Sequence, residues 1–312
     1  MTYEVLSTSP TFGYYACEPV EFMKSHGCEV ELVPQGKKLS EQKLSELVVK
    51  FDGIIVGTEK ITERVIGTGG RLKVIAKHGA GTDNIDMASA AKRGIAVVSA
   101  PGANSEAVAD LTMGLVLGVA RDIVRADRAV REGKWPRVVG VQLTNKVLGI
   151  IGLGQIGKRV AKRAIGFGMR VVAYDILPDH TFAQQFGLSY LPLDSLLTES
   201  DFVSVNVSLN AATKQLIGNR ELGLMKEDAA LISISRGEVI DEEALYHALK
   251  ERKIRAAALD VFTIEPLKDS PLTELDNVIV TPHMGGYTFE ALRETGMTCA
   301  RGIVAALQGT QT

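Results

Sequence analysis

The sequence contains few cysteines and few aromatic residues. Only three cysteines, Cys17, Cys28 and Cys299, occur in 312 residues, and phenylalanine, tryptophan and tyrosine make up 5%. The cysteines are odd in number and widely spaced, which fits neither a disulfide framework nor a zinc site. We therefore expect free buried thiols, no bound metal and a reducing, cytoplasmic location.

The sequence also lacks an excess of either charge and a long hydrophobic run. With 35 basic and 37 acidic residues, the net charge of −2 gives no electrostatic signature of a nucleic-acid or anionic-membrane partner. Residues 1–4 have neither the basic nor the apolar region of a signal peptide. The most apolar helical segment, 107–120, is interrupted by Asp110 and is too short to span a bilayer. We expect no membrane partner.

Short apolar runs alternate with helical segments along most of the chain, which predicts an α/β protein. Hydrophobic residues amount to 46%, and 31 glycines supply many tight turns. In the first hundred residues we predict strands at 3–7, 29–33, 53–56, 74–76 and 96–99, with helices at 19–25 and 40–49. A long helix, 106–121, and a charged one ending at Gly133 follow. Six further strands are predicted at 147–151, 170–174, 202–207, 230–234, 256–259 and 278–280.

This order predicts two doubly wound, Rossmann-like domains. The second sheet is complete by residue 280, so the helical tail, 289–307, is expected to return to the first domain. We predict a discontinuous substrate-binding domain, 1–100 plus 287–312, and a nucleotide-binding domain, 101–286. The cleft between the domains is expected to hold cofactor and substrate.

A glycine-rich motif follows the strand predicted at 147–151. Gly152, Gly154 and Gly157 satisfy G-x-G-x-x-G, and a helix is predicted directly after them. The first glycine permits a tight turn, the second lets the backbone approach a pyrophosphate, and the third lets helix and strand pack closely. The helix N-terminus supplies free N–H groups to the phosphates. The sequence therefore predicts a dinucleotide site.

The strand predicted at 170–174 ends in Asp175, close to the spacing expected for the ribose-binding acid of such a site. A carboxylate there accepts hydrogen bonds from the ribose hydroxyls and repels a 2′-phosphate. The predicted cofactor is therefore NAD rather than NADP.

Three ionisable residues follow late strands of the second domain. Arg236 follows 230–235, Glu265 follows 258–262, and His283 follows 278–282. Because ligands of open α/β sheets bind outside the carboxyl ends of the strands, all three are expected to face one crevice. Each alone has a plainer interpretation: a surface ion pair, a helix start before Pro266, and a loop histidine. Together they suit hydride transfer, with a cation for a carboxylate, an imidazole for proton transfer and a carboxylate to orient it.

Six segments resemble the D-isomer-specific 2-hydroxyacid dehydrogenases, and within them the phosphoglycerate dehydrogenase-like branch. The likeness spans nearly the whole chain. The segments are 77–86 (KHGAGTDNID), 101–105 (PGANS), 152–157 (GLGQIG), 235–241 (SRGEVID), 259–266 (LDVFTIEP) and 281–286 (TPHMGG).

The resemblance implies a role for each matching residue. Arg236 anchors the substrate, His283 is the acid/base, Glu265 orients the histidine, and Asp260 binds the nicotinamide amide. Backbone N–H groups of Gly79, Ala80 and Gly81 hold the substrate carboxylate. The resemblance also implies the two-domain fold, the use of NAD and a homodimer formed through the region of the long helix, 106–121. The further cofactor contacts expected are Gln155, Ile156, Val207, Ser208, Thr213, Ile234 and Gly285.

Three further features bear on cofactor affinity and on the identity of the substrate. The 205–209 run has asparagine and serine where many relatives have histidine and proline, which is expected to alter cofactor affinity. Gly57 stands where phosphoglycerate-oxidising relatives often carry a phosphate-binding arginine. Lys77 and His78 are candidates for binding a distal anionic group; alternatively, Lys77 is a solvated surface charge and His78 a packing residue.

The predicted function is NAD-dependent interconversion of a small (R)-2-hydroxy acid and its 2-keto acid. The prediction includes substrates with and without a second anionic group. Formate and phosphite dehydrogenases are rival enzymes on this fold. An NAD(H)-sensing corepressor or binding protein is the alternative outside the enzyme class. Trp135 is interpreted as a packing anchor or a dimer contact.

Overall fold

The structure is a computed structural model that describes residues 2–36 and 39–309. It contains two compact units, and each is described by itself. Unit 1 combines residues up to 104 with those from 286 onward, and unit 2 runs from Ser105 to Gly285. The first boundary, after residue 104, thus lies four residues later than expected from the sequence. The second boundary, before residue 286, lies one residue earlier. Unit 1 is discontinuous because its last helix comes from the chain end.

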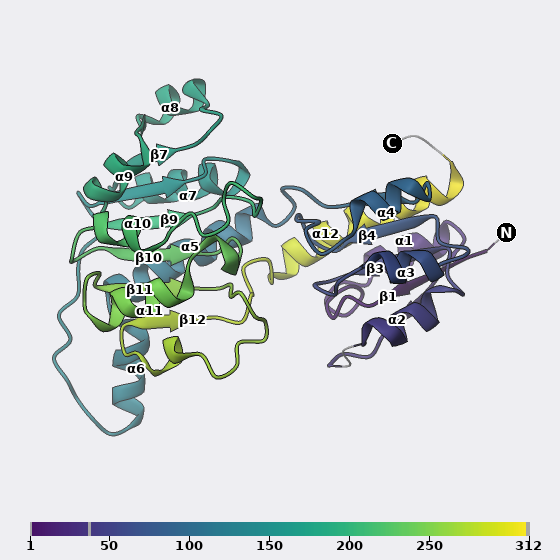
Figure 1. Cartoon of the computed structure of the whole chain (residues 1–312), viewed down its shortest axis with the longest axis horizontal. Helices are drawn as coiled ribbons and strands as arrows, with labels where there is room; N and C mark the ends of the chain where they lie inside the picture. Colours follow the sequence, from purple (N-terminus) through teal and green to yellow (C-terminus); the bar gives the residue numbers. More distant parts are fainter. Residues whose placement is uncertain (1, 37–38, 310–312) are drawn as a thin grey trace. The chain divides into compact units, whose positions relative to one another are not determined.

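Unit 1 is built on a five-stranded parallel sheet (Figure 1). The strand order is β2-β1-β3-β4-β5. Pairing of Val5 with both Val30 and Gly53 fixes the register of the first three strands. The strands are β1 (Tyr3–Ser7), β2 (Cys28–Leu32), β3 (Gly53–Val56), β4 (Val74–Lys77) and β5 (Ala96–Val98).

Helices cover both faces of this sheet. One face packs on α1 (Glu18–Ser25) and the long α12 (Phe289–Gln308), through buried residues such as Met23 and Ile303. The other packs on α2 (Glu41–Val48), α3 (Glu63–Thr68) and α4 (Met87–Lys92). The central strands β3 and β4 are buried at every residue, as expected of parallel strands between two helical layers. The predicted return of the chain end to the first domain is seen in α12, which lies against α1 and β4.

Unit 2 is built on a seven-stranded parallel sheet of order β12-β11-β10-β9-β6-β7-β8. The order reverses beside β6, and ligands bind at such switch points in open α/β sheets. The strands are β6 (Val147–Ile151), β7 (Arg170–Tyr174), β8 (Ser189–Tyr190), β9 (Phe202–Val205), β10 (Ala230–Ser233), β11 (Ala256–Leu259) and β12 (Val278–Val280).

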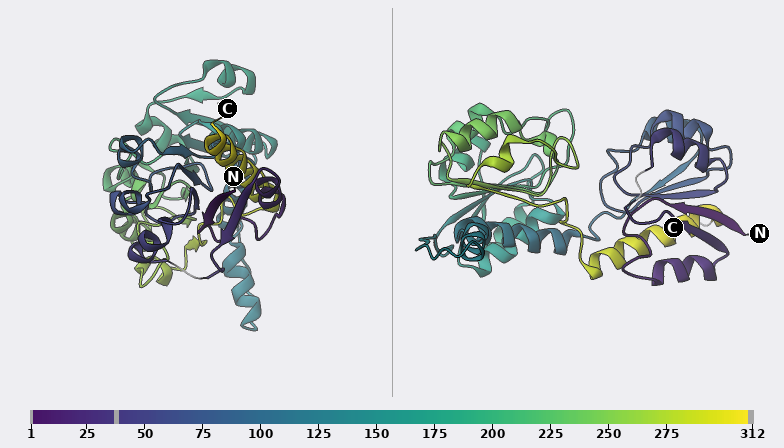
Figure 2. Two further views of the ribbon diagram at one scale, coloured as in Figure 1. Left: turned by 90° about the vertical axis from the view of Figure 1, so that its right-hand side faces the viewer. Right: turned by 90° about the horizontal axis from the view of Figure 1, so that it is seen from below.

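The helices of unit 2 form a layer on each face of its sheet (Figure 2, right). The layer containing α5 (Ser105–Ala120) and α7 (Gln155–Gly166) packs on residues such as Leu148 and Ile232. The opposite layer packs on Val203 and Leu231. This second layer consists of α9 (Leu193–Glu199), α10 (Asn219–Leu224) and α11 (Glu242–Lys250), while α8 (His180–Phe186) joins the first layer beside β7.

One helix of unit 2 is not packed into either layer. Helix α6 (Ile123–Arg131) projects from the unit and has no buried residue (Figure 1). Its apolar side chains Ile123, Val124 and Val130 are about half exposed, and beyond it Trp135 is 87% exposed. Trp135 is therefore not a packing anchor within this chain.

The predicted α/β class with two parallel sheets is confirmed. The structure corrects one detail of the sheets and two interpretations of single residues. The second sheet has seven strands rather than six, because β8 has only two residues and leaves no apolar run in the sequence. Cys17 is exposed, so only Cys28 and Cys299 are buried thiols. Lys77 is 7% exposed and is not a solvated surface charge. Within the described residues, no helix is long and apolar enough to cross a membrane.

Candidate active site

The turn from β6 to α7 has the backbone that a dinucleotide requires. Gly152 adopts φ +92°, and a Cβ there would lie 2.9 Å from the Val207 side chain. A Cβ on Gly157 would lie 2.2 Å from the Gly152 carbonyl oxygen. A Cβ on Gly154 would meet nothing within 4 Å, so this residue faces open space. The turn therefore packs tightly at Gly152 and Gly157 and is open at Gly154, where a pyrophosphate would approach.

Helix α7 begins at Gln155 without a side-chain cap, because its N-cap residue is Gly154. Its first N–H groups are thus available to an anion, and the helix dipole adds partial positive charge. Gln155 turns its side chain to Arg159 and Ile156 packs on the core, so these two residues offer backbone groups. These features fit the phosphates of a dinucleotide.

Asp175 lies beside this turn, directly after β7. Its Oδ2 accepts from the Leu153 N–H at 2.7 Å, and its Oδ1 accepts from the Leu177 N–H at 2.9 Å. Each carboxylate oxygen has a second lone pair for a ribose hydroxyl. The first hydrogen bond ties the acid to the glycine-rich turn, which is the arrangement expected of a ribose-binding carboxylate.

The loop after β9 closes over Gly152. The Asn206 and Val207 backbone lies about where a Gly152 side chain would extend, at 3.0 Å from the position of its Cβ. The Thr213 hydroxyl donates to the Ser208 carbonyl at 2.6 Å and accepts from the Asn210 N–H at 2.8 Å. Of the residues expected to contact the cofactor, Val207 lies at the turn, whereas Ser208 and Thr213 brace the loop around it.

The three ionisable residues lie at neighbouring strand ends of unit 2. His283 Nδ1 and Glu265 Oε2 are 2.7 Å apart, with side chains 36% and 30% exposed. The other Glu265 oxygen accepts from the Phe262 N–H at 3.0 Å. Arg236 follows β10 and is half-buried. A Cβ on the next residue, Gly237, would lie 1.9 Å from the Phe262 carbonyl carbon, so the two loops are in direct contact.

The electrostatics of this cluster keep the glutamate ionised. Burial raises the pKa of the Glu265 carboxyl, but the hydrogen bond and charge of His283, the Phe262 N–H and the charge of Arg236 lower it more. The net pKa lies below its ordinary value. An ionised carboxylate only accepts, so the proton of His283 lies on Nδ1 and its Nε2 remains for a substrate proton.

Asp260 and Gly285 form a buried contact below the His283 loop. Asp260 is 1% exposed and accepts from the Gly285 N–H at 2.8 Å, the Met284 N–H at 2.9 Å and the Thr281 hydroxyl at 2.6 Å. Ile234 lies in the core beside β10. Sequence reasoning gave no role to Thr281, Phe262 or Gly237. The contiguous motifs around Asp260 and His283 were the only signal that could have found them.

In unit 1, Lys77 ends β4 and its ammonium donates to the Gly57 carbonyl. A Cβ on Gly57 would lie 3.2 Å from Glu59 Oε2 and 3.3 Å from Pro10, so there is little room for an arginine there. The Gly79 N–H donates to the Lys77 carbonyl at 2.9 Å, so one of the three N–H groups expected to hold the substrate carboxylate is already bonded within the chain.

His78 is enclosed in unit 1. Its Nδ1 lies 3.1 Å from both the Ser9 and Thr11 hydroxyls, and its ring packs edge-on against Phe12. Burial, and to a smaller extent the charge of Lys77, lowers the pKa of His78 to about 4, although a backbone hydrogen bond with Leu292 acts in the opposite direction. His78 is therefore neutral at pH 7, and the structure favours its packing interpretation over anion binding.

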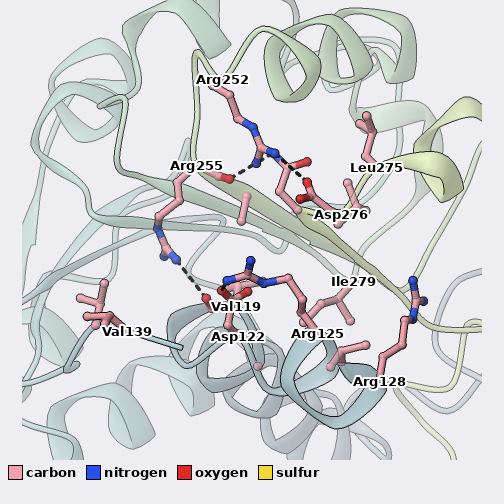
Figure 3. A pocket seen from close by; sticks show the side chains of 16 residues that line it. Val119, Asp122, Arg125, Arg128, Val139, Arg252, Arg255, Leu275, Asp276 and Ile279 are labelled. Carbon is pink, nitrogen blue, oxygen red and sulfur yellow. Dashed lines mark hydrogen bonds and ion pairs between the residues drawn. The ribbon is translucent and has the colours of Figure 1, made fainter. Parts of the chain in front are cut away.

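A cavity elsewhere in unit 2 is lined by arginines (Figure 3). Arg252 pairs with Asp276 at 2.6 Å, and Arg255 donates to the Val119 carbonyl at 2.9 Å. The cavity borders Ala256 and Val278, the first residues of β11 and β12, so it lies at the amino ends of the strands. It is thus separate from the carboxyl-end cluster. Among the residues that the structure describes, no group of three or more histidines, cysteines and carboxylates is arranged to hold a metal.

Comparison with known proteins identifies unit 2. Residues 113–285 match the family model described as "D-isomer specific 2-hydroxyacid dehydrogenase, NAD binding domain". Unit 2 is therefore an NAD-binding domain, in agreement with the glycine-rich turn and Asp175.

The relatives carry several names. The D-3-phosphoglycerate dehydrogenase of Methanocaldococcus jannaschii is 44% identical over 90% of this chain, which spans 54% of that protein. The chain spans about half the length of this relative and of a second D-3-phosphoglycerate dehydrogenase, from Archaeoglobus fulgidus. The hydroxypyruvate reductase of Thermotoga maritima is 41% identical over 89% of this chain and 92% of that protein.

A solved structure shares the fold of the whole chain. The D-lactate dehydrogenase of Aquifex aeolicus, in complex with NAD and lactic acid, aligns with a TM-score of 0.85 at 29% identity. The alignment covers 98% of this chain and 96% of that one.

Proposed function

Because the chain belongs to the D-isomer specific 2-hydroxyacid dehydrogenase family, we propose that it interconverts a small (R)-2-hydroxy acid and its 2-keto acid with NAD. The observation that carries this proposal is the 2.7 Å contact between His283 and Glu265, partly exposed and next to the Arg236 loop in the NAD-binding unit. NAD, when bound, accepts or supplies the hydride at C2 of the substrate.

His283 moves the proton. In oxidation, neutral Nε2 accepts the proton of the C2 hydroxyl; in reduction, the imidazolium returns it to the carbonyl oxygen. The ionised Glu265 stabilises the imidazolium and fixes the ring by accepting from Nδ1. The pair therefore holds the protonated and neutral forms of the histidine in one orientation.

Arg236 anchors the substrate carboxylate. A guanidinium binds a carboxylate through two parallel hydrogen bonds, which fixes both the distance and the plane of the substrate. In unit 1, the proposal assigns carboxylate binding to the N–H groups of Ala80 and Gly81. Gly79 precedes this donor pair and Gly81 belongs to it, and glycine allows a close approach of the backbone.

The substrate class follows from the surroundings of Gly57. The site lacks an arginine there and has little room for one, so a small 2-keto acid without phosphate, such as glyoxylate or hydroxypyruvate, is proposed. Lys77, whose ammonium donates to the Gly57 carbonyl, is the cation proposed to lie beside a distal anionic group. Replacing it with alanine, and comparing substrates that differ only in the distal charge, tests that role. Equal effects on neutral and dianionic substrates exclude it.

The proposal is tested by following NADH oxidation with glyoxylate, hydroxypyruvate and pyruvate, and NAD reduction with 3-phosphoglycerate. We expect turnover of at least one unphosphorylated keto acid, strict preference for the (R)-hydroxy acid in reverse, and loss of the signal in His283→Ala. A protein that binds NADH but turns over none of these acids would be an NAD(H)-sensing protein instead.

The chain is also proposed to form a homodimer in the cytoplasm. Exposed apolar side chains run from α6 into the following segment, ending at Trp135 and Val139, which are 87% and 90% exposed. Such a patch on a projecting helix suits a second copy of the chain. Light scattering of the wild type should give the mass of two chains, and Trp135→Asp should give one. Val49→Asp, at another exposed valine, is the control and should leave the dimer intact.

A further inference from the structure

Asp260 is one of few charged side chains buried in the described part of unit 2. It directly follows β11, and 1% of its surface is exposed. Burying a carboxylate is costly unless hydrogen bonds replace the lost water. Three donors do so here, and all three lie within residues 281–285. The carboxylate is therefore matched to one loop rather than to a scattered set of partners.

That loop carries His283 in a strained conformation. His283 adopts φ +52°, a left-handed backbone conformation that is unfavourable for a non-glycine residue. The donors to Asp260 stand on both sides of it: Thr281 two residues before, and Met284 and Gly285 directly after. A Cβ on Gly285 would come within 3.2 Å of Asp260 Oδ2, so glycine permits the close approach of its N–H. The carboxylate thus clamps both ends of the strained residue.

We propose that Asp260 is a positioning residue for His283, a role that rests on the proposed function and goes beyond contact with the cofactor. Two carboxylates then hold different parts of one histidine. Glu265 holds the imidazole at Nδ1, and Asp260 holds the backbone that carries it. Asp260 Oδ2 accepts one hydrogen bond from the loop, that of the Gly285 N–H.

The role is tested at Thr281, because its hydroxyl touches Asp260 without belonging to the cofactor contacts. Thr281→Val removes the 2.6 Å hydrogen bond at nearly constant volume, and Thr281→Ser keeps it. We expect Thr281→Val to lower kcat about tenfold with the Kd for NADH unchanged within twofold, and Thr281→Ser to retain wild-type kcat. Thr273→Val removes an exposed hydroxyl bond of the same unit and should leave kcat unchanged.

A double-mutant cycle with Asp260→Asn separates the two roles of the aspartate. If Asp260 acts through the loop, the losses in kcat from Asp260→Asn and Thr281→Val overlap, and the double variant loses less than their product. If Asp260 acts on the cofactor alone, Thr281→Val by itself has no effect on kcat. If Asp260 and Thr281 act on turnover independently, their losses multiply. Either of these last two results overturns the proposal.

A second measurement does not depend on turnover. The imidazole resonances of His283, assigned through His283→Gln in histidine-labelled protein, report the ring's surroundings directly. Thr281→Val should shift and broaden them, while Thr281→Ser and Thr273→Val should not. An inactive wild type would refute the proposed function and leave this test standing. Unchanged His283 resonances in Thr281→Val would refute the positioning role even in an active enzyme.

Discussion

The carboxyl ends of the strands differ between the two parallel sheets. In unit 1 the strand ends bind one another: hydroxyls after β1 reach His78 after β4, and Asn84 donates to the carbonyls of Gly57 and Glu59 after β3. In unit 2 the turn after β6 has open space above Gly154 and an uncapped helix behind it. The partly exposed Arg236, Glu265 and His283 stand at strand ends of the same sheet.

The difference teaches that strand-end polar residues do not by themselves make a ligand site. The two units share a layered architecture, but at the strand ends of unit 1 the Ser9 and Thr11 hydroxyls bind His78, and the Asn84 amide binds backbone carbonyls. In unit 2 the glycines remove side chains from the turn, and the His283–Glu265 contact engages only Nδ1 of the imidazole. Function is thus decided by which hydrogen-bonding groups remain for a ligand rather than by the fold.

The sharpest test of this contrast is His283→Ala. Removing the general acid/base should lower kcat by roughly 10²–10⁴-fold, while the Kd for NADH stays close to wild type. Steady-state assays and NADH fluorescence titration measure the two quantities. His247→Ala, at an exposed histidine of the same unit, is the matched control. A near-normal kcat in His283→Ala would remove the residue from the mechanism.

Arg236→Lys should have the next largest effect. An ammonium cannot make two parallel hydrogen bonds to a carboxylate, so kcat/KM for the keto acid should fall about a hundredfold. Both a higher KM and a lower kcat are expected, because the substrate is held less tightly and less squarely. Arg252→Lys, in a surface ion pair with Asp276, provides the control. If both constants are unchanged at Arg236, its role is structural.

Much of this site could be predicted from the sequence, because its signals are local. The β6 run, the three glycines and Asp175 lie within thirty residues, and the strand-to-helix turn needs only that order. The β8 strand could not be found, since two residues carry no periodicity. The hydrogen bonds from Thr281, Met284 and Gly285 to Asp260 were equally hidden, because they join residues more than twenty positions apart.

The two interpretations of Lys77 and His78 show the same limit. Burial depends on the whole of unit 1: Cys299, from the far end of the chain, donates to the Lys77 carbonyl at 3.2 Å. Burial raises the pKa of that thiol to about 12, so it stays a protonated donor. The sequence around residue 77 contains no sign of this partner.

His78 offers a test on the closed side of the comparison. Its folded-state pKa of about 4 lies below the ordinary value of 6.5, so the unfolded chain binds more protons between these values. Stability therefore falls as the pH drops through 6.5, by about 2 kcal/mol between pH 7 and 5. Urea unfolding at several pH values should show this fall, and His78→Gln should reduce it. An equal fall in both proteins would mean that other groups cause it.

Asp175→Ala tests the open turn after β6 in unit 2 and should have the smallest effect of these substitutions. Loss of the ribose acceptor should raise KM for NAD about tenfold, and loss of the negative charge should narrow the preference over NADP. Asp175 also accepts from the Leu153 and Leu177 N–H groups, so alanine loosens the turn as well. Asp175→Asn removes the charge but keeps the side-chain shape and one of the two acceptor oxygens, so it disturbs the turn less than alanine does. We expect Asp175→Asn to change the ratio of KM values for the two cofactors more than KM for NAD itself. A wild type that prefers NADP, or an unchanged ratio in both variants, would show that the Asp175 charge does not select the cofactor.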